Sequence, residues 1–288
     1  MKFKNPVLII ILPALLFSPV AVYAADENVA VSLGRMNFDY EETDIDGTFL
    51  DGEYGDIYGF SIDYSRNLRN NMLARFSLEY FRGVVDYDGH LQSALDPPDL
   101  NVQMFPFKSE TEETVLTLSA YLAGQIIPSI KGLSIYGKFS YKNWGRDIQG
   151  RFVSENGNLG TPINEVVPNL YEEYSWWQLN AGLHYRLDIA SVSWLEFFAG
   201  FLQTLNPTME IGSYELDLGE KQGYEFGAAW FFNIAPHKRL GISSSVSHWE
   251  FGRSNTIQTG FNDFILEPDS ESLMKTIKVT FEWDLKKR

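Results

Sequence analysis

The chain of 288 residues contains no cysteine, so disulfide bonds contribute nothing to its stability. Beyond the N-terminal region it also lacks any continuous apolar run of the roughly 20 residues that a membrane-spanning helix needs. Only four histidines are present, so candidates for acid–base chemistry can be considered one by one. The formal net charge of −15 counts against nucleic-acid binding and against a basic patch for anionic lipid.

The N-terminal segment has the pattern of a secretory signal peptide. Lys2 and Lys4 precede a short apolar run, and Ala24 ends a small-residue cleavage pattern. We therefore expect residues 1–24 to be removed on export. Residues 25–288 then form a single domain.

The clearest structural signal is a two-residue periodicity in residues 132–146, GLSIYGKFSYKNWGR. Leu133, Ile135 and Phe139 fall on one face of this segment, whereas Lys138 falls on the other. Such alternation predicts a strand with one apolar and one polar face. The segment is long for a soluble strand, where about five or six residues is usual. A wall between lipid and a polar interior fits this pattern.

Similar alternation recurs along the chain, with short and long connections in turn, and aromatic residues make up 15% of it. These features predict an all-β fold, a transmembrane antiparallel up-and-down β-barrel of about ten strands, with eight or twelve as alternatives. A soluble β-sandwich is the competing fold. The polar tail after Trp283 departs from the C-terminal aromatic residue usual in such barrels. The expected strands span residues 29–39, 54–66, 72–85, 114–126, 132–146, 171–187, 192–204, 223–233, 240–253 and 273–285.

The predicted architecture also predicts where the protein is located. We expect the protein in the outer membrane of a Gram-negative bacterium after signal-peptide export, with outer-membrane lipid and lipopolysaccharide as its surroundings. The sequence indicates no nucleic-acid partner, and it identifies no extracellular ligand.

The polar faces of the expected strands carry charges of both signs. Because a narrow barrel is filled by its own side chains, we expect these charges to pair inside the lumen. A selective pore is the alternative, although a pore more often has one dominant sign. The predicted lumen charge network comprises Asp63, Arg75, Glu79, Lys138, Lys142, Arg146, Arg186, Glu196, Glu225, Lys278 and Glu282.

The first long connection, residues 39–56, contains many acidic residues and neither lysine nor arginine. Asp44 and Asp46 match the start of a calcium-binding loop, but the remaining ligand spacing is missing. We expect a solvated acidic rim that binds Ca²⁺ or Mg²⁺ loosely, and no other cofactor.

A second pair of carboxylates, Asp86 and Asp88, follows the third expected strand. With the ten-strand layout and the sixth strand, residues 171–185, this pair resembles the omptins, a family of outer-membrane proteases. The resemblance implies a ten-stranded barrel and a water-activating site of an aspartate pair and an Asp-x-His pair. The matching region, residues 205–214 (LNPTMEIGSY), has neither aspartate nor histidine.

Three functional hypotheses follow. The leading one is a non-catalytic barrel whose surface loops serve a structural, adhesion or recognition role. The second is an omptin-like hydrolase that uses Asp86, Asp88 and His90. The third is a small pore. No histidine precedes a serine in the arrangement of barrel lipid hydrolases, which counts against that chemistry.

Overall fold

The structure is a computed structural model that describes residues 27–44, 47–68, 72–94, 102–125, 127, 129–153, 159–162, 171–258 and 264–285. The expected signal peptide and Asp46 lie outside these ranges. Within them, no helix is long and apolar enough to cross a membrane.

Ten long strands form the wall in the described part of the chain, which confirms the predicted number and the all-β class. The short strands are β6 (Leu159–Pro162), β9 (Tyr214–Asp217), β10 (Gly219–Glu220), β13 (Ile257–Gln258) and β14 (Phe264–Ile265). The long strands are β1 (Glu27–Thr43), β2 (Phe49–Leu68), β3 (Met72–Ala94), β4 (Val102–Gln125), β5 (Leu133–Val153), β7 (Tyr171–Ala190), β8 (Ser193–Ile211), β11 (Gln222–Ala235), β12 (Lys238–Gly252) and β15 (Asp269–Leu285).

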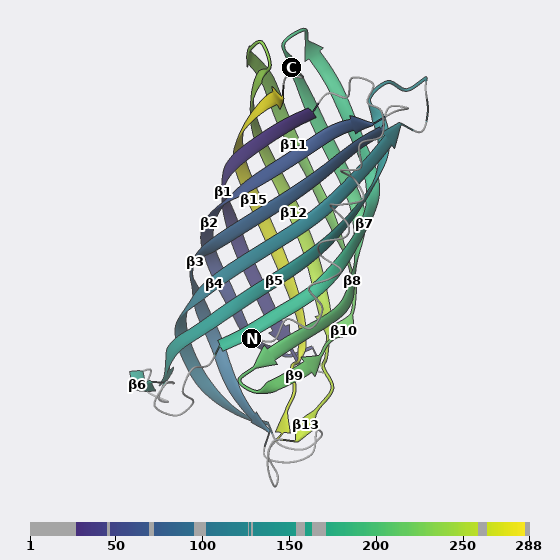
Figure 1. The fold of residues 1–288 in the computed structure, drawn as a ribbon. Coiled ribbons are helices and arrows are strands. Elements are labelled where there is room, and N and C mark those ends of the chain that lie inside the picture. The colour runs from purple at the N-terminus through teal and green to yellow at the C-terminus, as the bar shows by residue number, and fades with distance from the viewer. Residues whose placement is uncertain are drawn as a thin grey trace.

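The long strands close into an antiparallel barrel (Figure 1). Each pairs with its neighbours in sequence, and β1 closes the ring on β15 with Glu27 opposite Leu285 and Thr43 opposite Asp269. Closure leaves no long strand with an unpaired edge, as a β-structure in lipid requires. The short strands β6, β9, β10 and β13 lie at the lower end of Figure 1, which we call the long-loop end.

A belt of exposed apolar side chains surrounds the barrel. Leu33 is 70% exposed and Phe201 is 81% exposed, which is unfavourable in water but expected against lipid. Toward the long-loop end the belt stops at outward-facing charged pairs. We call these pairs the charged border: Arg35 with Asp56, Arg82 with Glu112, and His248 with Glu271.

The wall continues well past this border, so the sequence prediction of long loops there was wrong. Residues 86–94 and 102–110 were expected to be loop, yet they pair in β3 and β4 from Asp86 opposite Glu110 to Ala94 opposite Val102. Outside lipid, neither face of a strand has to be apolar, so backbone pairing persists although the alternation fades. We call this region the extramembrane wall.

Candidate functional site

The interior of the extramembrane wall is filled by aromatic side chains. Trp144 of β5 stacks on Tyr174 of β7 with ring centroids 4.5 Å apart, and its ring also contacts Phe38 and Tyr40 of β1. All four side chains are almost completely buried. Because successive strand residues alternate sides, the same periodicity that points apolar residues at lipid turns these rings inward. The barrel is therefore packed at this level.

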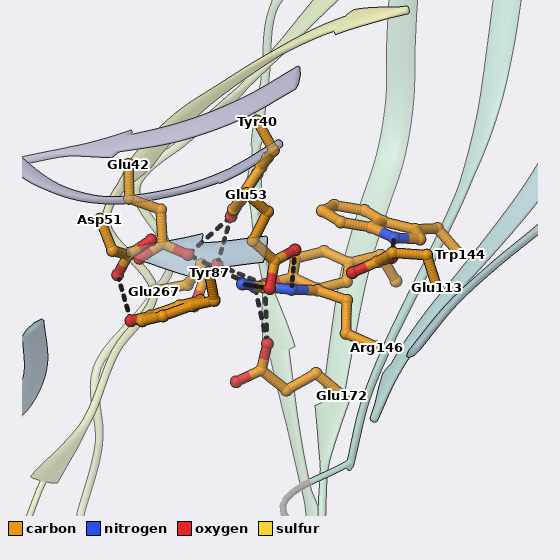
Figure 2. A network of polar contacts seen from close by, with 11 residues as sticks. Tyr40, Glu42, Asp51, Glu53, Tyr87, Glu113, Trp144, Arg146, Glu172 and Glu267 are labelled. Atoms are coloured by element: carbon orange, nitrogen blue, oxygen red, sulfur yellow. Dashed lines mark hydrogen bonds and ion pairs between the residues drawn. The ribbon is translucent and has the colours of Figure 1, made fainter. Parts of the chain in front are cut away.

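Arg146 lies in the middle of this packing and is only 2% exposed (Figure 2). Its Nη1 donates to Glu172 Oε2 at 2.8 Å and to Glu42 Oε1 at 3.4 Å, and its Nε donates to Glu53 Oε2 at 3.1 Å. The guanidinium also lies 4.7 Å from the centroid of the Tyr40 ring. One side chain from β5 thus connects β1, β2 and β7 across the lumen.

The carboxyl groups around Arg146 greatly outnumber it. We call them the acidic cluster: Glu42, Asp51, Glu53, Glu113, Glu172 and Glu267. Among the described residues, Arg146 is the one cation in ion-pair contact with this cluster. Uncompensated buried carboxylates are costly, so several must keep their protons.

The pKa values agree with that requirement. Burial raises the pKa of Asp51, Glu113 and Glu267 well above the usual range for carboxyl groups. Burial also raises the pKa of Glu172 to about 7, although the guanidinium of Arg146 opposes that shift. These residues lie beyond the charged border, outside the lipid belt.

Neighbouring side chains donate hydrogen bonds to the cluster. Tyr87 donates its hydroxyl to Asp51 Oδ2 at 3.0 Å, and the Trp144 indole N–H donates to Glu113. The charge of the nearby Glu53 adds to the effect of burial and raises the pKa of Glu113 further, so Glu113 keeps its proton. A protonated Glu113 needs no second cation beside it.

The acidic cluster connects strands of the extramembrane wall through Arg146. A general base has to reach a water molecule and a substrate, and its usual identity is histidine. The cluster is buried, and His184, His237 and His248 each have their ion-pair contacts elsewhere in the described chain. What the geometry shows is three carboxyl groups from different strands that share the Arg146 guanidinium.

The carboxylates that suggested a protease do not face this interior. Asp86 and Asp88 are exposed on the outside of β3, where Asp88 lies 3.8 Å from Lys108. The side chain of His90 lies outside the described part of the structure. The strand order β3-β2-β1-β15-β12 puts His248 four strand spacings from β3, roughly 19 Å away. His248 therefore lies too far from Asp86 and Asp88 to act together with them.

Within the lipid belt, the predicted lumen charges lie close to partners of opposite sign. Lys278 contacts Glu79 at 2.5 Å, and Lys138 contacts Glu225. Lys142 instead makes a cation–π contact, with its ammonium 4.0 Å from the Trp249 ring centroid.

The remaining predicted lumen residues lie nearer the short turns. Glu196 contacts His184 at 3.4 Å, Arg186 contacts Asp188 at 2.9 Å, and Arg239 contacts Glu282. Arg75 stacks 5.6 Å from the Tyr121 ring centroid, and Ser77 donates to Asp63.

The prediction of a solvated acidic rim is partly wrong. Glu42, Asp51 and Glu53 were assigned to a solvated connection, but they are buried. Asp44, one of the two calcium candidates, lies 3.6 Å from Arg253. Continuing the alternation of β1 from Met36 would have placed Glu42 on the inner face.

Comparison with solved structures gives the fold a precedent. The outer membrane protease OmpT from Escherichia coli superposes with a TM-score of 0.60 at 10% identity, covering 92% of this chain and 99% of that chain. An outer membrane channel from Pseudomonas putida F1 gives 0.40 at 10% identity, covering 92% and 97%. The attachment invasion locus protein Ail of Yersinia pestis gives 0.32 at 11%, covering 90% and 99%.

No family model matches the chain, and no curated protein matches it in sequence. The similarity to OmpT establishes an omptin-like ten-stranded outer-membrane barrel fold. This similarity of fold does not assign an activity to the chain, because proteins with the same fold can have different functions.

Replacing Arg146 with methionine tests the central ion pair. We expect R146M to lower the free energy of unfolding by about 3–5 kcal/mol, because it leaves buried carboxylates without a cation. The matched control is R82M, whose exposed partner is Glu112. We expect R82M to change stability by about 1 kcal/mol or less. Urea unfolding of the barrel in lipid vesicles measures both, and equal effects would contradict a central role for Arg146.

The raised pKa of Glu172 predicts a pH dependence of stability. The folded state holds this proton up to about pH 7, whereas the unfolded chain releases it near 4.5. Stability should therefore fall as pH rises from about 4.5 to 7, by roughly 3 kcal/mol for this group. E172Q should flatten this fall, whereas E173Q, on the outer face, should not. Unfolding midpoints measured from pH 4.5 to 8 decide the question, and identical profiles for both variants would exclude Glu172 as the source.

Proposed function

We propose that this protein is exported to the outer membrane and acts there as a closed, non-conducting and non-catalytic barrel. Its role would be that of a surface structural, adhesion or recognition protein. The supporting observation is the contrast between the two regions of its wall. The interior is packed, whereas the strands run far beyond the lipid belt and present a long polar surface.

The packed interior argues against a pore. A hollow of about 740 Å³ opens at the end of the barrel opposite the long-loop end. Its walls include Arg75, Trp194, Glu196 and Arg239. Deeper in the lumen, side chains such as Asn180 are fully buried. Trp144, Arg146 and Tyr174 fill the next level, so the hollow has no observed continuation to the long-loop end.

The outer face of the extramembrane wall is the surface available to partners. It is predominantly acidic, with Glu41, Asp86, Asp88, Glu110 and Glu173 all on outward positions. Acidic, solvated walls repel other anionic surfaces and attract cations and basic partners. A recognition role at this face fits both its charge and its distance from the lipid.

We expect planar lipid bilayers containing the purified barrel to show no conductance steps. The matched variant replaces Trp144 and Trp176 with alanine, which removes two almost completely buried rings from the lumen. A heat-modifiable shift in gel migration checks that this variant still folds. Steps in the variant alone would support closure by side chains, whereas steps in the unmodified protein would establish a pore and overturn the proposal.

The rival hydrolase has its own test. We expect the folded protein to leave a peptide library uncleaved, because Asp86 and Asp88 face outward on β3. The double variant D86A/D88A serves as the comparison. Cleavage by the unmodified protein that disappears in this variant would restore the omptin-like activity.

A further inference from the structure

Three potential metal ligands meet on the outside of the barrel at the charged border. His248 and Glu250 extend from β12, and Glu271 extends from the neighbouring β15. His248 Nε2 lies 3.5 Å from Glu271 Oε2 and 4.0 Å from Glu250 Oε1. One ligand atom from each residue lies within 4.8 Å of the others.

The strand register makes this cluster unfavourable without a cation. Glu271 is directly opposite Glu250 on one side and Glu41 on the other, so three acidic residues follow one another across β12, β15 and β1. Like charges directly opposite each other destabilise a sheet. Glu41 accepts a hydrogen bond from Tyr54, whereas no lysine or arginine in the described chain forms an ion pair with Glu250 or Glu271.

The imidazole is held in place for ligation. The Tyr224 ring of β11 stacks on His248 with centroids 4.9 Å apart and planes within 13°. The side chains of Glu250 and Glu271 are 38% and 54% exposed, so an ion can reach them from water. A fixed ring beside two accessible carboxylates is a partly preorganised site.

We propose that His248, Glu250 and Glu271 bind a divalent metal ion of the zinc class. Imidazole nitrogen and carboxylate oxygen both ligate Zn²⁺, and three protein ligands with a water in the fourth position are the usual composition of an open zinc site. Tetrahedral zinc separates its ligand atoms by about 3.4 Å, so the 3.5 Å and 4.0 Å distances need only small side-chain adjustments. Ca²⁺ and Mg²⁺ prefer more oxygen ligands than this cluster offers.

The bound ion would connect β12 to β15 just outside the lipid belt. It would neutralise the opposed glutamates and add a link between neighbouring strands near the long-loop end. The competing explanation is a protonated His248 that pairs with both carboxylates and binds no metal.

Zinc binding to the full, folded barrel in detergent tests the site. After treatment with EDTA, equilibrium dialysis against Zn²⁺ followed by metal analysis should show one tightly bound zinc per chain. We expect H248Q and E271Q to weaken this binding at least about tenfold. The matched control, H237Q, removes a histidine that pairs with Asp284 at the opposite end, and it should bind zinc normally. Heat-modifiable gel migration confirms that each variant is folded.

A second readout is independent of the metal count. Saturating Zn²⁺ should raise the unfolding temperature of the unmodified barrel and of H237Q, but not that of H248Q. Equal zinc binding by the unmodified protein and H248Q would overturn the proposal, as would the absence of tight binding, which would leave the protonated histidine. Displacement of zinc by equimolar Ca²⁺ or Mg²⁺ would also overturn the assignment to a zinc-class ion.

Discussion

The extramembrane wall of this barrel depends above all on the interactions of the Arg146 guanidinium. This guanidinium lies within hydrogen-bond distance of carboxylates from β1, β2 and β7, and it is almost fully buried. A buried cation is stable only with partners, and the surrounding carboxylates are stable only with a cation or a proton. The guanidinium and the carboxylates therefore stabilise one another, and their contacts join strands that are far apart in the sequence.

Charge is handled differently on the two sides of the charged border. Within the lipid belt, acidic and basic residues approach in pairs, as Lys278 does with Glu79 and Lys138 with Glu225. In the extramembrane wall, the acids exceed the bases, and protons held by burial make up the difference. The arrangement in the extramembrane wall weakens as those protons are lost.

Two-residue periodicity was sufficient to predict the ten strands, because lipid demands an apolar face on every one of them. It failed past the border, where that demand ends and strands β3 and β4 continue without a regular alternation. The inward position of Glu42 could have been found by extending the periodicity of β1. The meeting of Arg146 with Glu53 could not, because it depends on how strands far apart in sequence face each other across a closed wall.

The alternation of side chains between the two faces of a strand also bears on function. In a strand, residues two apart always share a face, so Asp86 and Asp88 must both point inward or both point outward. Phe81, Val85 and Tyr87 occupy the inner face, and the aspartates therefore stand outside. A ten-stranded wall can thus carry an aspartate pair and present it to the surroundings instead of to the lumen. The placement of a carboxylate pair relative to its strand, rather than its presence in the sequence, decides whether such a barrel has an interior catalytic site.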